Sequence, residues 1–431
     1  MEILVALIAA AAFILVGIPI GYVLIAASVL AIWLTTNTPL VVVPLRLFNG
    51  TDSFPLVAIP LFILAGALMN HAGISRRLTD FAAALVGWMR GGLAMTTTAS
   101  SMLFSEMSGS AVADAAALGS VLIPAMKERG YPAAFAAAVL SASATIAILI
   151  PPSIPMILFG AVTGASIARL FLAGFVPGVL AGAFIMLVSR ALAKRGGFGD
   201  SEPFRLRRAG TAARAAAWPL LIPLIILGGI FLGWFTATEA AAVAVLLALL
   251  MGVAGYRTVR FAAIREAFTE SARQTAVVML LVAGSAILGW YLANQQAPER
   301  LTAWVLSLAD APWAVALILN GVLLLAGTIL HSAAAIVLLV PILLPLAESA
   351  GIGTVHFGMM VTVSLAVGQQ TPPVASVLIT TCSIAKTEIS EVMKVNVFFI
   401  AALLVVLGIV TFWPEVSLFL PDLILGKAAG S

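Results

Sequence analysis

Apolar stretches long enough to cross a membrane follow one another along this chain. Two of them, 216–235 and 238–255, are separated only by a short turn. Across the 431 residues, 62% are hydrophobic and 9% are charged, whereas about a quarter of the residues of soluble domains are charged. The sequence therefore predicts an all-α polytopic membrane protein of roughly ten to a dozen spans, since each span takes about 20 apolar residues. The N-terminus lacks the basic start of a signal peptide, so we expect an uncleaved first span.

Basic residues gather in two polar stretches, and these set the expected orientation. Seven lie within 190–215 and four within 257–273. By the positive-inside rule both stretches face the cytoplasm. Residues 257–273 alternate arginine with apolar and acidic residues, which is typical of an amphipathic helix on the membrane surface. An ordinary solvated helix is the alternative.

Two further apolar regions have a polar centre, and each arm is too short to span the bilayer. In 93–126 the centre is the Ser/Gly-rich segment 105–110, and basic residues flank both ends. In 313–347 the tip is at 330–332, and the flanks are acidic. We expect two re-entrant hairpins that enter from opposite faces, which indicates an inverted repeat. Matching residues at a constant offset support this repeat. An offset of 221 residues pairs Gly130 with Gly351 and the prolines 151–152 with 372–373.

Each half also contains a helix that is interrupted by proline. Consecutive prolines remove amide donors and push the preceding residue out of helical geometry. The carbonyl groups that lose their partners must then face protein, water or an ion, because lipid cannot satisfy them. Freed carbonyls and hydroxyls suit Na⁺, and half-helix N-termini suit an anionic group. A kinked helix without a ligand is the alternative at a single site, but two matched sites beside hairpin tips favour binding.

The hairpin tips and the proline breaks supply the candidate substrate site. Glycine lets the backbone approach a ligand, and a serine at a tip either caps the next helix or binds the ligand. Glu106 and Asp114 are candidate coupling carboxylates or paired structural charges. A lone histidine at a tip is more often a hydrogen-bonded turn residue than a proton carrier. The substrate-binding candidates are Ser108, Gly109, Ser110, Pro151, Pro152, His331, Ser332 and Pro373.

These features divide the chain into scaffold and transport parts. In the first half we expect N-terminal scaffold helices at 1–72, a first arm helix at 73–92, and the first transport half at 93–189, with hairpin 93–126 and broken helix 133–165. A cytoplasmic basic loop at 190–215 leads to scaffold helices at 216–293, which include an amphipathic arm at 256–275. An external connection at 294–312 then precedes the second transport half at 313–394, with hairpin 313–347 and broken helix 355–385, and a C-terminal helix and tail at 395–431.

The sequence lacks the motifs that are typical of several classes of enzyme. The sequence has no glycine-lysine phosphate loop, no His/Glu metal motif and no persuasive Ser/His/Asp order. Cys382 is the only cysteine, which excludes disulfides within the chain. Glu239 follows Thr236 at the start of a span and is expected to cap that helix. We therefore expect a transporter and not an enzyme, driven by an ion gradient or by another subunit.

Long motifs in the chain resemble the large membrane subunit of tripartite ATP-independent periplasmic (TRAP) transporters. They are Phe-Ser-Glu-Met-Ser-Gly-Ser-Ala-Val-Ala-Asp at 104–114 and Ile-Pro-Pro-Ser-Ile-Pro at 150–155, with shorter matches at 47–50, 52–55, 130–131, 238–242 and 371–374. The likeness covers nearly the whole chain.

The resemblance implies an elevator-type, inverted-repeat importer of the bacterial inner membrane that is coupled to Na⁺ and has no organic cofactor. Its implied partners are a separate four-span membrane subunit, a periplasmic binding protein, the lipid bilayer and a small anionic carboxylate such as a C4-dicarboxylate or a sialic acid, but no nucleic acid. The Na⁺ ligands that the resemblance implies are Ser108, Gly109, Ser110, Ala144, Thr145, Gly327, Thr328, Gln370, Thr371 and Pro372.

This chain departs from the family pattern at the implied ion sites. Glycine is usual where it has Ala144 and Ala147, proline where it has Ile148, and an acidic residue where it has His331. Residues 369–370 are both glutamine and are more polar than the pattern. The alternative functions are a free-standing Na⁺/carboxylate symporter without a binding protein, an intramembrane enzyme for lipid-linked substrates, and a scaffold protein.

Overall fold

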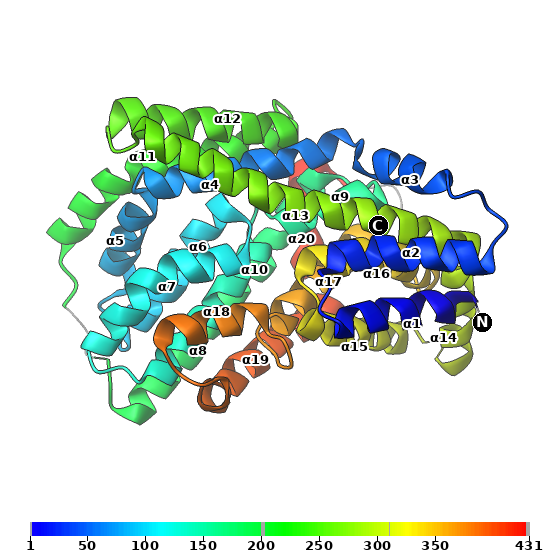
Figure 1. The fold of residues 1–431 in the computed structure, drawn as a ribbon. Coiled ribbons are helices and arrows are strands. Elements are labelled where there is room, and N and C mark those ends of the chain that lie inside the picture. Colours follow the sequence, from blue (N-terminus) through cyan, green and yellow to red (C-terminus); the bar gives the residue numbers. More distant parts are fainter. Residues whose placement is uncertain (1, 200–202, 310, 428–431) are drawn as a thin grey trace.

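The computed structural model describes residues 2–199, 203–309 and 311–427, and these ranges are helical almost throughout, without a β-strand (Figure 1). Within them, eight helices are long and apolar enough to cross a membrane. The helices that prolines divide fall into shorter apolar pieces, which is why the spans of full length are fewer than the sequence predicted. The prediction of an all-α, multi-pass membrane protein is confirmed.

The same order of elements occurs twice, as the inverted repeat predicted. Each half has an arm helix, a hairpin of two helices, a helix broken by prolines, and a long helix. The first set is α5 (Ile74–Val86), α6 (Gly92–Ser108), α7 (Ala111–Glu128), α8 (Ala133–Ala144) with η2 (Thr145–Ile148), α9 (Ile154–Thr163) and α10 (Ile167–Gly196). The second set is α14 (Ala297–Leu308), α15 (Pro312–Ile329), α16 (Ser332–Ser349), α17 (Thr354–Gly368), α18 (Ser376–Ala385) and α19 (Ile389–Phe412).

The remaining helices surround these two sets. They are α1 (Glu2–Leu15), α2 (Ile20–Thr35), α3 (Val42–Thr51), η1 (Phe54–Val57), α4 (Ala58–His71), α11 (Leu206–Phe231), α12 (Ala237–Leu250) with η3 (Met251–Gly255), α13 (Phe261–Asn294) and α20 (Glu415–Leu425). The long helix α13 packs against α2, α3 and α4, and it also contacts α16 of the second hairpin. It therefore connects the outer helices to the repeat.

Small residues let α2, α3 and α13 approach closely, as is common between membrane helices. A Cβ atom added to Gly50 would lie 2.2 Å from the Cβ of Ala286, and one added to Gly284 would lie 3.0 Å from the carbonyl oxygen of Gly21.

A capping box fixes the turn before α12. The Thr236 N–H donates to Glu239 Oε2 at 2.8 Å, and the Glu239 N–H donates back to Thr236 Oγ1 at 3.3 Å. This capping box confirms the role expected of Glu239.

Several expected boundaries are wrong. The basic stretch 190–215 is not one loop, because α10 continues to Gly196 and α11 begins at Leu206. Alanine-rich sequence from 209 to 217 favours helix and extends α11 into the basic stretch. The segment 294–312, expected as a connection, contains α14, and the region 395–431 holds α20 in addition to most of α19.

The expected arm at 256–275 is not a separate helix either. Helix α13 runs without interruption over 34 residues, so the polar segment is its N-terminal part. Such a helix is about 50 Å long and exceeds the hydrocarbon core of about 30 Å, which leaves its arginine-rich start at or beyond the membrane boundary. The first hairpin tip is also narrower than expected, because α6 continues through Ser108.

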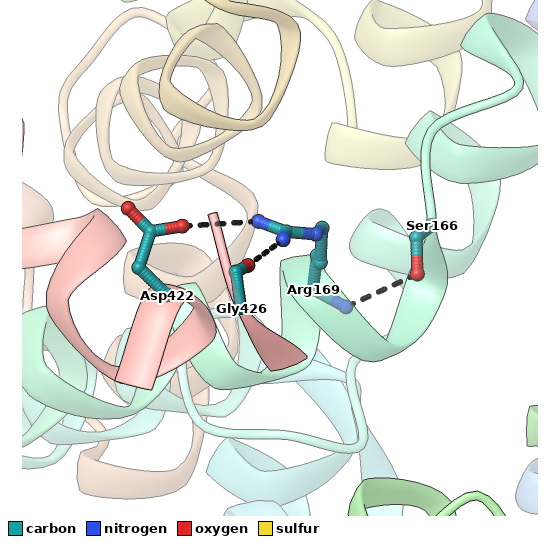
Figure 2. A network of polar contacts seen from close by, with 4 residues as sticks. All are labelled: Ser166, Arg169, Asp422 and Gly426. Carbon is teal, nitrogen blue, oxygen red and sulfur yellow. Dashed lines mark hydrogen bonds and ion pairs between the residues drawn. The ribbon is translucent and has the colours of Figure 1, made fainter. Parts of the chain in front are cut away.

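The C-terminal helix α20 is tied to the start of α10 by one arginine (Figure 2). Arg169 Nη1 lies 3.1 Å from Asp422 Oδ1, and Nη2 donates to the carbonyl oxygen of Gly426. The Arg169 N–H donates to Ser166 Oγ at 3.4 Å, which caps α10. The two charged side chains are 14% and 22% exposed, so this contact is shielded more than a surface ion pair.

Candidate functional site

A cavity of about 650 Å³ lies where the two hairpin tips meet α4 and α13. Four of the substrate-binding candidates from the sequence line it: Gly109 and Ser110 from the first tip, and His331 and Ser332 from the second. These tips are more than 200 residues apart in the chain. The inverted repeat thus brings both tips to one place.

Other candidates lie elsewhere. Pro151, Pro152 and Pro373 are not among the residues that line the cavity, although Ile154 and Pro155 of α9 are. The side chains of Glu106 and Ser108 lie outside the part of the chain that the structure describes. Asp114 is fully buried in the first turn of α7, where the helix dipole favours a carboxylate.

Three helices begin at the cavity wall: α7, α16 and α9, whose first residues Ile154 and Pro155 line the cavity. Ser110 Oγ accepts a hydrogen bond from the Ala113 N–H at 3.4 Å at the start of α7. His331 Nδ1 accepts one from the Ala333 N–H, also at 3.4 Å, at the start of α16. Helix N-termini carry a partial positive charge and attract anions. No lysine or arginine stands among the described residues that line the cavity, so these termini are its positive groups.

The wall opposite the tips contains polar residues that the sequence did not indicate. Asn70 comes from α4, and Glu270 and Gln274 come from α13. Gln274 Nε2 donates to Glu270 Oε1 at 3.2 Å, one helical turn apart. The sequence assigned 256–275 to a surface helix, and only the packing of α13 reveals that one face of it borders the cavity.

The first hairpin tip is packed backbone to backbone against the first proline break. Gly109 has φ +59°, and a Cβ atom there would lie 3.0 Å from the Pro152 carbonyl oxygen and 3.1 Å from the Ile154 nitrogen. The break passes through a cis peptide between Pro151 and Pro152. The Ser153 hydroxyl donates to the Ile148 carbonyl at 2.8 Å. A side chain at position 109 would be strained by the backbone conformation and crowded by the opposing backbone, so glycine is favoured there.

The second hairpin meets the second break in the same way. A Cβ atom on Gly368 would lie 2.5 Å from the Cα of Gly327. The Thr328 carbonyl accepts hydrogen bonds from the N–H groups of Val374 at 3.1 Å and Ala375 at 3.3 Å. This break also contains a cis peptide, between Pro372 and Pro373. Each hairpin is therefore held to its own broken helix by main-chain contacts.

Several backbone oxygens at the breaks have side-chain donors. The Gln370 carbonyl accepts from Asn396 Nδ2 at 2.9 Å, and the Thr371 hydroxyl donates to the Val367 carbonyl at 2.8 Å. At the first break, the Thr145 hydroxyl donates to the Ala142 carbonyl at 2.8 Å, and both Ala144 and Thr145 are fully buried. Oxygen atoms of this kind keep lone pairs after one hydrogen bond, so the donor set still fits a hard cation such as Na⁺.

The unsatisfied atoms at the second break are side-chain amides. Gln369, Gln370 and Asn396 are at most 1% exposed. Gln369 Oε1, Asn396 Oδ1 and both polar atoms of the Gln370 side chain have no hydrogen-bond partner. Buried polar groups are rarely left unpaired in native proteins, which points to water or a cation there. The sequence showed the polar Gln pair, but Asn396 stands in an apolar span and gave no signal.

Two hairpins, two broken helices and a cavity between the hairpin tips are the architecture of a multi-pass transporter built from an inverted repeat. Residues 7–416 match the family described as "Tripartite ATP-independent periplasmic transporter, DctM component", and the chain belongs to this family. It is thus a large permease subunit of the TRAP type in the inner membrane and not an enzyme.

Similar proteins agree with this assignment. The chain is 38% identical to the sialic acid TRAP transporter large permease protein SiaM of Vibrio cholerae, over 95% of this chain and 96% of that protein. It is 39% identical to the C4-dicarboxylate TRAP transporter large permease protein DctM of Pseudomonas aeruginosa, over 88% of each. The crystal structure of the YdaH transporter of Alcanivorax borkumensis shares the fold, with a TM-score of 0.62 at 16% identity over 89% of this chain and 90% of that one.

Proposed function

We propose that this subunit imports a small carboxylate by Na⁺ symport, with a separate small membrane subunit and a periplasmic binding protein that delivers the substrate. The observation that carries the proposal is the cavity between the hairpin tips. Three helix N-termini begin at its wall, and no described basic side chain lines it. Helix N-termini attract a carboxylate but do not neutralise it fully. Cations held at the neighbouring breaks would supply the missing positive charge, so anion and cation would bind together.

The names of the relatives support a carboxylate substrate. SiaM of Vibrio cholerae is named for sialic acid and DctM of Pseudomonas aeruginosa for C4-dicarboxylates. Main-chain and side-chain oxygens lie at both breaks, which suits Na⁺.

The parts of the molecule that bound the cavity support an elevator movement. One wall consists of the hairpin tips, which are held to the broken helices, and the other consists of α4 and α13. A shift of the first unit along the second would expose the substrate to each side in turn. The α13 residues that line the cavity, 270–278, belong to the half of the helix near the arginine-rich N-terminus. The positive-inside rule places that half toward the cytoplasm, so the cavity corresponds to an inward-facing state.

Uptake into proteoliposomes tests the proposal. We expect an imposed Na⁺ gradient to drive uptake of a radiolabelled carboxylate, chosen as the ligand of the cognate binding protein, only when all three proteins are present. Ser110→Ala and Thr371→Val should each raise the Na⁺ concentration needed for half-maximal uptake. Ser120→Ala is the matched control, because Ser120 is an exposed residue of α7 that does not line the cavity.

Two results would contradict parts of the proposal. Uptake by this chain alone would favour a free-standing symporter. Unchanged Na⁺ dependence in both variants would show that the ion binds elsewhere.

A further inference from the structure

The two sides of the cavity between the hairpin tips differ in charge. The hairpin tips form one side, here called the tip wall, and α4 and α13 form the other, here called the scaffold wall. Apart from His331, Glu270 on the scaffold wall is the one acidic or basic residue among the described residues that line the cavity, and it is exposed. The cavity thus has a side that attracts an anion and a side that repels one.

His331 adds a hydrogen-bond donor to the tip wall. Its Nδ1 accepts a hydrogen bond from the Ala333 N–H at 3.4 Å, so this nitrogen carries no proton. The ring is therefore neutral, and its proton is on Nε2. This N–H has no partner within the part of the chain that the structure describes. Like the helix N-termini beside it, it suits a carboxylate oxygen.

The scaffold wall offers acceptors and a negative charge. Gln274 Nε2 donates to Glu270 Oε1 at 3.2 Å, and Glu270 has no basic partner in the described ranges. Its two oxygens keep lone pairs for further donors. Asn70, the third polar residue of this wall, is neutral and does not compensate the charge.

We propose that the cavity selects a monocarboxylate whose far end carries hydroxyl or ammonium groups, and that it disfavours a dicarboxylate. The inference rests on the proposed function, because it takes as given that the tips hold a carboxylate. The far end of the ligand then lies toward Glu270. A hydroxyl or ammonium group can donate to the Glu270 carboxylate, whereas a second carboxylate has no hydrogen to donate and is repelled.

The volume of the cavity suits a ligand of this size. About 650 Å³ lies within the range of about 300–1,000 Å³ that is usual for pockets that enclose small organic molecules. An acid of six carbon atoms therefore fits, and it is long enough to carry different groups at its two ends.

Glu270 acts on the ligand in one state of the transporter. It belongs to α13 and not to the tips, so a ligand that the tips hold meets it only when the tips lie against this part of α13. That arrangement is the inward-facing one. The selection is therefore made on the cytoplasmic side of the membrane.

Four acids of six carbon atoms test the proposal, because three of them differ only at the far end. These three are 6-aminohexanoate, hexanoate and adipate, and gluconate is the polyhydroxylated fourth. Their dissociation constants would be measured from the rise in melting temperature of the purified full-length protein, with Na⁺ and with K⁺ in its place. We expect the protein to bind 6-aminohexanoate about twentyfold more tightly than adipate in Na⁺, since two opposite charge interactions of about fivefold each separate them.

The variant E270Q removes the charge, and E266Q is the matched control. Glu266 lies one turn earlier on α13, is exposed and does not line the cavity. In E270Q we expect about fivefold weaker binding of 6-aminohexanoate, about fivefold tighter binding of adipate and unchanged binding of hexanoate, whereas E266Q should change none of them. Weaker gluconate binding in E270Q would assign a hydroxyl partner to Glu270, and a loss confined to 6-aminohexanoate would assign an ammonium partner.

Further outcomes separate the inference from the proposed function. E270D keeps the charge and should keep the order of affinities, and the melting temperatures of the ligand-free variants show whether each one folds. Adipate bound as tightly as 6-aminohexanoate, or equal effects of E270Q and E266Q, would overturn the inference alone. If none of the four acids binds in a Na⁺-dependent way, the proposed function fails and the inference fails with it.

Discussion

The contact between Gly327 and Gly368 predicts that a larger residue at position 368 lowers the stability of the protein. Alanine at position 368 would put its Cβ 2.5 Å from the Cα of Gly327, whereas ordinary contacts of this kind begin near 3.4 Å. The second hairpin and the second broken helix would have to separate by about 1 Å, and overpacking of this size costs about 1–3 kcal/mol. Neither side of the contact can relieve the clash by changing a rotamer, because the opposing atoms are backbone.

The same substitution in open space has the opposite effect. Gly321 lies on the same hairpin helix α15, and no atom lies within 4 Å of where its Cβ would be. Glycine to alanine within a helix stabilises by about 0.5–1 kcal/mol when there is room. Gly321→Ala is therefore expected to raise the melting temperature slightly, while Gly368→Ala should lower it.

Thermal unfolding of the purified protein and Na⁺-driven uptake in proteoliposomes would measure both effects. A displacement of about 1 Å at a binding site can reduce a rate a hundredfold, so we expect uptake by Gly368→Ala to fall by more than tenfold. If Gly368→Ala and Gly321→Ala behave alike in both assays, the hairpin is not held to the broken helix by this contact.

Three other predictions follow from the structure. Gly109→Ala should lower uptake more than Gly130→Ala. Both residues have positive φ, but only Gly109 has backbone atoms within 3.1 Å of the added Cβ. Equal effects of the two substitutions would refute the close packing at Gly109. Arg169→Gln should destabilise the docking of α20 by about 1 kcal/mol or less, seen as faster hydrogen exchange in 415–425, whereas unchanged exchange would refute a role for this contact. Gln369→Leu removes a buried oxygen that has no hydrogen-bond partner, and such an atom costs about 1–3 kcal/mol of stability. The substitution should therefore raise the melting temperature measured without Na⁺. A lower melting temperature would mean that a bound ligand satisfies this oxygen.

The repeat and its hairpins could be predicted because they depend on local chemistry. Proline pairs, glycine and serine tips, and the length of apolar runs each act within a few residues of the chain. The boundaries of α13 could not be predicted in this way. Its arginine-rich start and its apolar remainder are different in composition, yet helical hydrogen bonds continue through both, and no glycine or proline ends the helix between them.

The candidate site was predicted only on the side of the tips. Ser110 and His331 stand at turns, where a polar residue is conspicuous in an apolar sequence. Glu270 on α13 and Asn396 on α19 gave no such signal, because what distinguishes them is the neighbour that each meets across the fold. These neighbours are set by contacts between helices that are far apart in the chain, and such contacts cannot be inferred from a single sequence.

The glycine contact between α15 and α17 also has a mechanical consequence. Main-chain atoms that touch directly have no side-chain torsions to absorb a displacement, so a hairpin and its broken helix behave as one stiff piece. Any large relative motion in this protein must then be accommodated where side chains still intervene, along the surface that Asn70 and Gln274 present to the tips. Substitutions on that surface would alter the speed of motion, whereas those at the glycine contact would alter the shape of what moves.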